Sequence, residues 1–422
     1  MSRQYSAEIL SVGTELLLGN TTNTDARDLS IHLSELGINV FYHTVVGDNP
    51  ERLAKAVEIA RGRADIIITT GGLGPTCDDL TKQVLAKSFG RELVFHKDLA
   101  DEMRRYFKEV IGHEMTENNL QQAYLPADCV VFNNDCGTAP GCAFETDGTR
   151  VIMLPGPPRE CNAMFKTSVV PYLKELSDEV IFSHNLHIFG VGESTVEFKL
   201  RNLMNELSNP TLAPYAKEGE VMLRVTAKAK SEAEAEALIA PVLKQVEAVL
   251  GDVIYGIDVV SLEKRVSELL REKGMTLCTA ESCTGGIIAK RITDLSGASK
   301  VFSGGCVTYT IETKTSLLGI DAALIEEKGV VSADVAIAMA ESARYIFGAD
   351  IALATTGLAG PDGDGVNPVG TVFVVLATKD ECFVSRMQSG FGRGRVRTLA
   401  SSCALDMVRR YLTGLPVAIE RK

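Results

Sequence analysis

The chain has 422 residues, 45% of them hydrophobic and 23% charged, so it can bury several ordinary cores and divide into two or three domains. Its formal net charge of -12 argues against broad binding to the phosphate backbone of nucleic acid, which needs clustered Lys and Arg. No run of about 18 apolar residues and no apolar signal region are present, so we expect a soluble, cytoplasmic protein without a membrane segment.

The first segment alternates strands and helices. Continuous apolar runs predict strands at residues 7–12, 39–46, 65–70 and 150–154, and apolar residues at helical spacing predict helices at 23–36 and 52–60. Buried strands between amphipathic helices indicate a parallel sheet covered on both faces, with ligands beyond the carboxyl ends of the strands. We therefore predict a three-layer α/β domain over residues 1–169, with one pocket where strand ends rich in Gly, Asp and Thr meet.

The middle segment, residues 170–255, has a different pattern. Alternation predicts strands at 180–190 and 221–228, and a helix follows at 232–250 with Ala235, Leu238, Val242 and Val246 on one side. Pro241 lies inside that helix, where it is expected to kink or split it. We expect a small α+β domain that spaces its neighbours and adds to the pocket.

The last segment, residues 261–422, is predicted to be a second α/β domain. Its predicted helices are 262–273, 287–292, 323–328, 332–347 and 396–412, and its predicted strands are 275–278, 304–309, 351–355 and 371–377. This segment contains no histidine, which excludes a Ser-His-Asp relay built within it. A Ser-Lys pair, with a desolvated lysine as the base, remains available.

The most informative stretch is the strand-to-helix turn at residues 279–286, which reads TAESCTGG. Unpaired amides at a helix N-terminus can hold an anion or a developing oxyanion. Ser282 is the best nucleophile there, although serine at such a turn is often a helix N-cap. Cys283 is an alternative nucleophile, but a cysteine at such a position is more commonly a buried, unreactive thiol. Glu281 either holds the turn through backbone amides or helps to position a lysine.

Ten cysteines are scattered without a CxxC pair, as is typical of reduced and mostly buried thiols. Cys129, Cys136 and Cys142 are close in sequence, but no histidine lies near them. A zinc site is therefore not expected.

Short motifs follow one another along both α/β segments. The N-terminal ones are 13–19 (GTELLLG) with Asn23, 70–79 (TGGLGPTCDD), 137–141 (GTAPG) and 154–160 (LPGPPRE). The C-terminal ones are 279–286 (TAESCTGG), 305–310 (GCVTYT) with Lys314, 356–361 (TGLAGP) and 370–372 (GTV). Each motif is a weak signal alone, but together and in this order the motifs resemble those of the CinA family (competence/damage-inducible protein A) over nearly the whole chain.

The resemblance implies that the C-terminal domain is a nicotinamide-nucleotide amidase, which converts nicotinamide mononucleotide (NMN) into nicotinate mononucleotide and ammonia without a cofactor. Ser282 would be the nucleophile and Lys314 the base, the alternative for Lys314 being a solvated helix position. Tyr309 would orient Ser282 or stack on the pyridine ring, or else be a half-buried strand residue.

The substrate-binding residues implied for this domain are Gly285, Gly286, Thr356, Arg393 and Arg397. The glycines would allow close approach of the substrate or merely tight packing, and Thr356 would bind ribose or phosphate or be a turn residue. The arginines would bind phosphate or remain solvated. The family commonly has an aspartate where this chain has Gly392, so the way in which Arg393 is held is open.

For the N-terminal domain the resemblance implies a molybdopterin-binding-like fold with metal-dependent ADP-ribose pyrophosphatase activity. Gly71, Gly72, Gly74 and Thr76 would cradle phosphate. The proposed metal ligands are Asp78, Asp79 and Glu15. The substrate contacts would be Asn23 and Arg159. Asp78 and Asp79 are alternatively N-caps of a helix at 80–87.

Carboxylate ligands favour magnesium, manganese or cobalt, and an added potassium ion stays open. The expected partners are small nucleotides, NMN and ADP-ribose, without direct nucleic-acid binding, and the resemblance implies a homodimer. Two other hypotheses remain: a nucleotide- or pterin-binding protein without catalysis, and a competence factor that contacts DNA-processing proteins.

Overall fold

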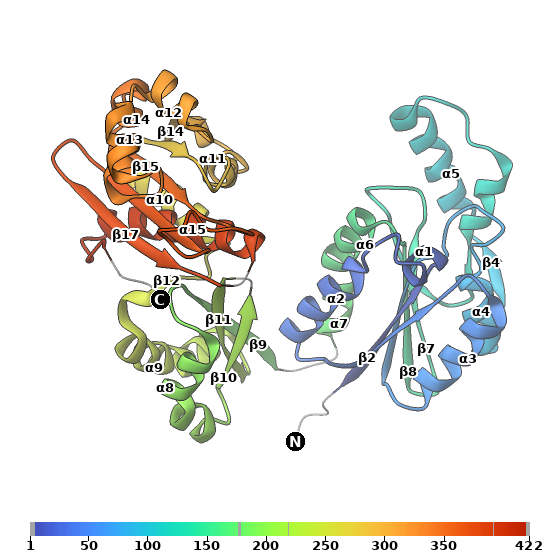
Figure 1. Cartoon of the computed structure of the whole chain (residues 1–422). Helices are drawn as coiled ribbons and strands as arrows, with labels where there is room; N and C mark the ends of the chain where they lie inside the picture. Colours follow the sequence, from blue (N-terminus) through green and yellow to red (C-terminus); the bar gives the residue numbers. More distant parts are fainter. Residues whose placement is uncertain (1–4, 176–178, 218, 391, 419–422) are drawn as a thin grey trace. The chain divides into compact units, whose positions relative to one another are not determined.

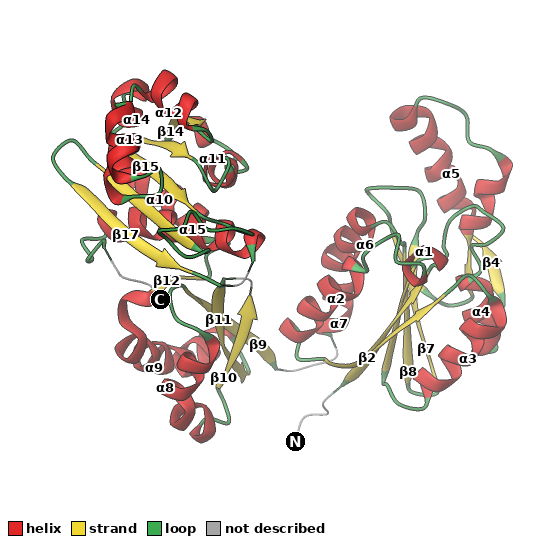
Figure 2. Cartoon of the chain, in the orientation of Figure 1, coloured by secondary structure: helices red, strands yellow, loops and turns green. Residues whose placement is uncertain are grey.

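The protein is described here by a computed structural model that covers residues 5–175, 179–217, 219–390 and 392–418 (Figure 1). The chain divides into two compact units, residues 1–182 with 227–236, and residues 183–226 with 237–422. Helices and strands alternate through most of both (Figure 2). Across the described residues, no helix has both the length and the apolar character that crossing a membrane requires.

The N-terminal domain is built on a six-stranded sheet in the order β2-β1-β3-β8-β7-β6. Four neighbouring strands are parallel: β2 (Asn39–Val46), β1 (Ser6–Val12), β3 (Ile66–Thr70) and β8 (Thr149–Leu154). The antiparallel strands β7 (Gly141–Thr146) and β6 (Val130–Phe132) complete it. The sequence pattern did not predict these two strands.

Successive residues of each central strand point to opposite faces of this sheet, and both faces are covered. Ile9, Ile68 and Ile152 pack with α2 (Thr24–Glu35) and α6 (Pro158–Met164) on one face. Leu10, Ile67 and Val151 pack with α3 (Pro50–Arg61) and α4 (Thr81–Ser88) on the other. The predicted three-layer fold is therefore confirmed.

Shorter elements complete the domain. They are α1 (Thr14–Leu17), β4 (Leu93–Phe95), α5 (Lys97–Tyr106), η1 (Phe107–Ile111), η2 (Glu117–Ala123), β5 (Tyr124–Pro126), η3 (Phe165–Val169) and α7 (Val170–Lys174). β4 and β5 form a separate two-stranded sheet.

The middle region forms an antiparallel sheet in the order β10-β11-β9-β12. Its elements are β9 (Val180–Ile188), α8 (Glu193–Glu206), β10 (Thr211–Lys217), β11 (Glu220–Ala229), α9 (Glu232–Leu250), η4 (Gly251–Val253) and β12 (Ile254–Ile257). The pattern predicted β9, β11 and α9, but not α8 or the β10 strand of the hairpin.

Two predictions for α9 need correction. The helix runs through Pro241 without being split. The buried stripe includes Ile239, whereas the predicted Leu238 is 39% exposed. Proline removes one backbone hydrogen bond, and the packing of Ile239 and Val242 on either side of Pro241 holds the helix together.

The C-terminal domain has a five-stranded sheet in the order β14-β13-β15-β16-β17. β14 (Phe302–Val307), β13 (Leu277–Glu281) and β15 (Ile351–Gly357) are parallel, and β16 (Thr371–Ala377) and β17 (Cys382–Gln388) continue it antiparallel. One face carries α10 (Leu262–Lys273), α11 (Ile287–Thr293) and α15 (Arg393–Leu412). The other face carries α12 (Ile311–Leu318), α13 (Ala322–Lys328) and α14 (Ala333–Phe347). The short helix η5 (Ala298–Lys300) packs on the first face.

The central strand β13 begins later than predicted, at Leu277 rather than Met275, and extends through Glu281. Thr279, Ala280 and Glu281 therefore belong to the strand and not to the turn. They pair with β14 on one side and β15 on the other, and all three are buried. This places Ser282 directly beyond the carboxyl end of the central parallel strand.

Candidate active site

Ser282 and Lys314 meet at this edge of the C-terminal sheet. The Nζ of Lys314 donates hydrogen bonds to the Oγ of Ser282 at 3.0 Å and to the carbonyl of Thr308 at 2.7 Å. Lys314 lies in the first turns of α12, which Thr310 starts with a reciprocal capping box. The helix start therefore fixes where the lysine enters the site.

The surroundings of Lys314 favour a neutral amine. Its exposed fraction is 0%, and that of Ser282 is 7%. Burial lowers the pKa of Lys314, because a charged ammonium loses its hydration there. No carboxylate pairs with this amine among the residues the structure describes. Such a lysine can accept a proton from a neighbouring hydroxyl.

Glu281 occupies the helix terminus that was expected to hold an anion. Its buried carboxylate accepts from the amides of Gly286 at 2.9 Å, Ile288 at 3.1 Å and Ala289 at 2.8 Å. The amide of Gly285 donates to the carbonyl of Ser282. The expectation of unpaired amides at the start of α11 is therefore wrong, because the protein's own carboxylate caps them.

The turn itself needs both of its glycines. Gly285 has φ 60° and Gly286 has φ 91°, conformations that residues with a Cβ rarely adopt. A Cβ on Gly285 would also lie 3.0 Å from the Nη2 of Arg397. The structure thus explains these glycines by backbone shape and packing. Direct contact with a substrate remains a prediction.

The two predicted arginines have different hydrogen-bond partners. Arg397 donates to the carbonyls of Cys283 at 3.1 Å and Thr284 at 2.9 Å, and so it braces the turn. Arg393 is more exposed and donates to the hydroxyl of Tyr309 and to the carbonyl of Gly360, both at 2.8 Å. The family's missing aspartate is thus replaced by two neutral acceptors.

Three other predicted positions have clear environments. Tyr309 is 56% exposed and bonds to Arg393, with no hydrogen bond to Ser282 among the described contacts. The hydroxyl of Thr356 is buried and donates to the carbonyl of Val330 at 2.8 Å. Burial raises the pKa of Cys283 to about 11, so its thiol stays protonated near neutral pH.

Sequence reasoning missed the threonines that frame the serine. The amide of Ser282 donates to the carbonyl of Thr355 at 3.0 Å, and the hydroxyls of Thr355 and Thr284 lie 2.7 Å apart. Thr308 supplies the carbonyl that holds Lys314. Thr308 lies just beyond β14, and Thr355 lies near the end of β15, opposite Glu281, so both are close to the carboxyl ends of strands that flank β13, and that position was the available signal.

The glycine loop of the N-terminal domain also has a defined shape. Gly71 and Gly72 have φ of 92° and 68°. A side chain on Gly71 would collide with the carbonyl of Val12, and one on Gly72 would collide with the hydroxyl of Thr81. That hydroxyl donates to the carbonyl of Gly71 at 2.9 Å, which joins the loop to the start of α4.

Asp78 and Asp79 gather around Thr76. Asp79 accepts from the amide of Thr76 at 2.8 Å and from its hydroxyl at 2.6 Å, and Asp78 accepts from the same hydroxyl. The alternative of helix capping is not what the structure shows, because α4 begins at Thr81 without a side-chain cap. A Cβ on Gly74 would press against the carboxylate of Asp79.

The predicted metal ligands do not form a set of three. Within the described ranges, no group of three or more His, Cys, Asp or Glu residues is arranged to hold a metal ion. Glu15 lies exposed in α1 and does not join Asp78 and Asp79 in such a group. The residues therefore fit a cation only as a two-carboxylate site completed by other oxygens, such as substrate phosphates.

The two predicted substrate contacts of this domain differ in environment. Asn23 caps α2 by accepting from the amide of Ala26 at 3.1 Å, and its amide group donates to the hydroxyl of Ser11 at 2.9 Å. Arg159 is exposed at the start of α6. Arg159 is thus the more exposed of the two, whereas Asn23 is partly buried and engaged in the cap of α2.

The N-terminal prediction overlooked Lys82. This lysine is 2% exposed and donates to the carbonyls of Gln121 at 2.8 Å and Gln122 at 3.0 Å. Burial lowers its pKa to about 8. Its burial was hard to predict from the sequence, because a lysine in the first turn of a helix is ordinarily solvated.

Family comparisons cover the chain in three parts. Residues 8–175 match the family described as "Probable molybdopterin binding domain". Residues 183–256 match "Damage-inducible protein CinA KH domain", and residues 259–412 match "CinA C-terminal domain".

Two relatives match nearly the whole chain, and one solved structure matches part of it. The CinA-like protein of Kosmotoga olearia is 47% identical over 412 residues, covering 97% of this chain and 99% of that protein. The CinA-like protein of Dictyoglomus turgidum is 47% identical over 409 residues, with the same coverage. A crystal structure of CinA from Thermoplasma acidophilum is 32% identical and covers 41% of this chain and 98% of its own, with a TM-score of 0.37. The near-complete matches show that this chain belongs to the CinA family.

Proposed function

We propose that the C-terminal domain hydrolyses the amide of nicotinamide mononucleotide to nicotinate mononucleotide and ammonia. The observation that carries this proposal is the 3.0 Å contact between the amine of Lys314 and the hydroxyl of Ser282. A hydroxyl becomes a nucleophile when an adjacent base removes its proton, and a desolvated amine is such a base. Membership of the CinA family supports an enzymatic role.

In the proposed reaction, the proton of Ser282 moves to the Nζ of Lys314 as the Oγ attacks the amide carbon. The tetrahedral intermediate then collapses: the C–N bond breaks, and Lys314 returns the proton to the leaving ammonia. Water attacks the resulting ester in the same way and releases the carboxylate. Among the described residues, the amide of Thr284 donates to no acceptor, so it can serve the developing oxyanion.

The phosphate of the substrate is assigned to Arg393. Its two bonds to Tyr309 and Gly360 fix the guanidinium but use only part of its donor capacity. Arg397 is already committed to two carbonyls, which favours a supporting role for it. Tyr309 then lies beside the phosphate-binding group and does not touch the reacting hydroxyl.

The test is ammonia release from nicotinamide mononucleotide by the full chain, with nicotinate mononucleotide identified by chromatography. Turnover by wild type and its loss in Ser282→Ala would support the proposal. Binding of the nucleotide without turnover would instead favour a nucleotide-binding protein. Undiminished turnover in Ser282→Ala would reject the assigned nucleophile.

We further propose that the N-terminal domain cleaves ADP-ribose into AMP and ribose 5-phosphate. The supporting observation is the turn in which Asp78 and Asp79 share the hydroxyl of Thr76 next to the Gly71–Gly72 loop. Each carboxylate keeps an oxygen that makes no protein hydrogen bond in the described set. A divalent cation bound there would polarise the pyrophosphate and lower the pKa of water.

This second activity has its own measurement. The full chain is incubated with ADP-ribose and magnesium, manganese or cobalt, and AMP is quantified. Asp79→Asn should also weaken binding of Mn²⁺ measured by its paramagnetic resonance, independently of turnover. Unchanged Mn²⁺ affinity in that variant would remove Asp79 from the site.

A further inference from the structure

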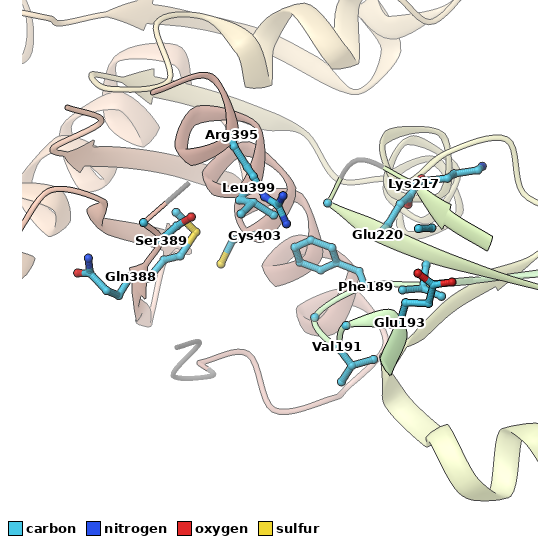
Figure 3. Close-up of a pocket in the computed structure, with 17 residues that line it drawn as sticks. Phe189, Val191, Glu193, Lys217, Glu220, Gln388, Ser389, Arg395, Leu399 and Cys403 are labelled. Atoms are coloured by element: carbon cyan, nitrogen blue, oxygen red, sulfur yellow. The ribbon is translucent and has the colours of Figure 1, made fainter. Parts of the chain in front are cut away.

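A cavity lies within the C-terminal unit, between the middle sheet and helix α15. Its volume is about 630 Å³, within the range of roughly 300–1,000 Å³ for small-molecule sites. Its walls are the segment before α8, residues at the end of β10 and the start of β11, the end of β17 and one side of α15 (Figure 3). None of these segments belongs to the Ser282 site.

Helix α15 separates the two sites by its own geometry. Arg393 and Arg397 contact the Ser282 turn and its neighbours. Arg395, Leu399 and Cys403 follow at a spacing of four residues and line the cavity. Positions two apart on a helix are about 200° apart around its axis, so the two sets face opposite sides.

Uncommitted polar groups face this cavity. The hydroxyl of Ser389, in a residue 6% exposed, has no hydrogen-bond partner among the residues that the structure describes. Helix α8, which is 14 residues long, begins at the cavity wall with Gly192 as N-cap and no side-chain cap. The amides of Glu193 and Ser194 precede the first intrahelical hydrogen bonds, so they can donate hydrogen bonds to an anion.

Apolar groups form the rest of the lining. Figure 3 shows Arg395 extending from α15 toward the ring of Phe189, with Leu399 and Cys403 on the same helix. An aromatic ring, an aliphatic side chain and a guanidinium in one cavity match a ligand with an apolar body and a negative charge.

We propose that this cavity is a binding site for a small organic anion, distinct from the Ser282 site. The anionic group is met by Arg395 and by the start of α8, the hydroxyl of Ser389 supplies a further hydrogen bond, and the apolar body packs on Phe189 and Leu399. Glu193 and Glu220 also line the cavity, and Glu220 accepts from the hydroxyl of Tyr255. These carboxylates oppose polyanions and favour a ligand of low charge.

The probe is 8-anilinonaphthalene-1-sulfonate, an aromatic monoanion, titrated into the full chain and followed by calorimetry. Leu399→Trp fills the cavity, and because the chain has no other tryptophan, the emission of the new indole reports its burial. Arg395→Ala removes the charge at an exposed position without altering a core. Arg386→Ala, at an exposed position on β17, is the matched control.

Wild type should show one saturable site that Leu399→Trp abolishes and that Arg395→Ala weakens about tenfold, as expected for a lost charge-assisted hydrogen bond. The Arg386→Ala variant should bind like wild type. Any probe bound elsewhere contributes equally to all variants, so the difference between them is the measurement. The proposal is overturned if wild type has no saturable site, or if folded Leu399→Trp, checked by its melting curve, retains the full number of sites.

Discussion

Lys314 and Ser282 are 32 residues apart in the chain, and yet their Nζ and Oγ atoms lie 3.0 Å apart in a buried site. The arrangement follows from topology: β13 and β14 are adjacent parallel strands, so the segment after β14 returns over the end of β13. The carbonyl of Thr308, just beyond β14, then fixes the amine from the other side. A buried amine held by neutral oxygens, with no carboxylate on it among the described residues, is poised to act as a base.

Substitution of either member should remove amidase activity. Ser282→Ala and Lys314→Met should each lower kcat on nicotinamide mononucleotide on the order of 10³-fold or more, as for other nucleophile–base pairs. Methionine replaces the lysine with a similar volume, so the core should stay packed. The assay is steady-state ammonia release, with the fold checked by circular dichroism.

Cys283→Ser is the matched control for this pair. It changes the neighbouring side chain of the same turn while retaining its size, and activity should stay within about threefold of wild type, as for a nearly isosteric change away from the chemistry. Loss of activity in Cys283→Ser together with retention in Ser282→Ala would transfer the nucleophile to the cysteine.

The pH dependence of kcat/KM should report Lys314. The proposed reaction requires the neutral amine, and burial lowers the pKa of this lysine, so activity should fall as pH drops through that lowered pKa and level off above it. The inflection should lie clearly below the ordinary lysine pKa of about 10.4. A thiolate nucleophile would instead give activity still rising near pH 11, because the pKa of Cys283 is raised to about 11.

The free energy of unfolding should also depend on pH through the lowered pKa of Lys314. At a pH below the lowered pKa, Lys314 is charged and buried, which destabilises the native state. As pH rises from that value toward about 10.4, the native state loses its proton before the unfolded state does, and the free energy of unfolding rises. Lys314→Met should therefore be more stable than wild type, by a margin that shrinks across this window in urea titrations. A margin independent of pH would contradict the assignment.

The parallel strands were predictable because they are largely apolar runs, such as Ile66–Thr70, which lies between amphipathic helices. The antiparallel strands β6, β7 and β10 were not predicted. The directions of polar side chains were not. Glu281 could hold the turn or position Lys314, and only the placement of three amides around its carboxylate decided between them. Likewise, the spacing of Arg393 and Arg397 places both on one face of a helix, but it does not predict that Arg393 is exposed while Arg397 is partly buried.

Loss of the Glu281 carboxylate should affect both stability and catalysis. In Glu281→Gln, a neutral amide replaces an acceptor of three backbone hydrogen bonds and buries its own NH₂ group. The expected cost is roughly 2–4 kcal/mol in the unfolding of the C-terminal domain. Because Ser282 is the next residue, kcat should fall as well. Glu326→Gln, an exposed change on α13, should alter neither quantity. An unchanged denaturation midpoint in Glu281→Gln would show that the cap is unimportant.

Substitutions of Arg393 and Arg397 should change different kinetic parameters and should differ in their effect on a substrate without phosphate. Arg393→Ala should raise KM for nicotinamide mononucleotide about 10- to 100-fold with little change in kcat, because it removes the proposed charged contact with the phosphate. Arg397→Ala should instead lower kcat and thermal stability, because the carbonyls of Cys283 and Thr284 lose their brace. Nicotinamide riboside, which has no phosphate, distinguishes the two roles. Its turnover should be unaffected by Arg393→Ala and reduced by Arg397→Ala, and equal losses on both substrates in Arg393→Ala would assign that arginine to the turn instead of the phosphate.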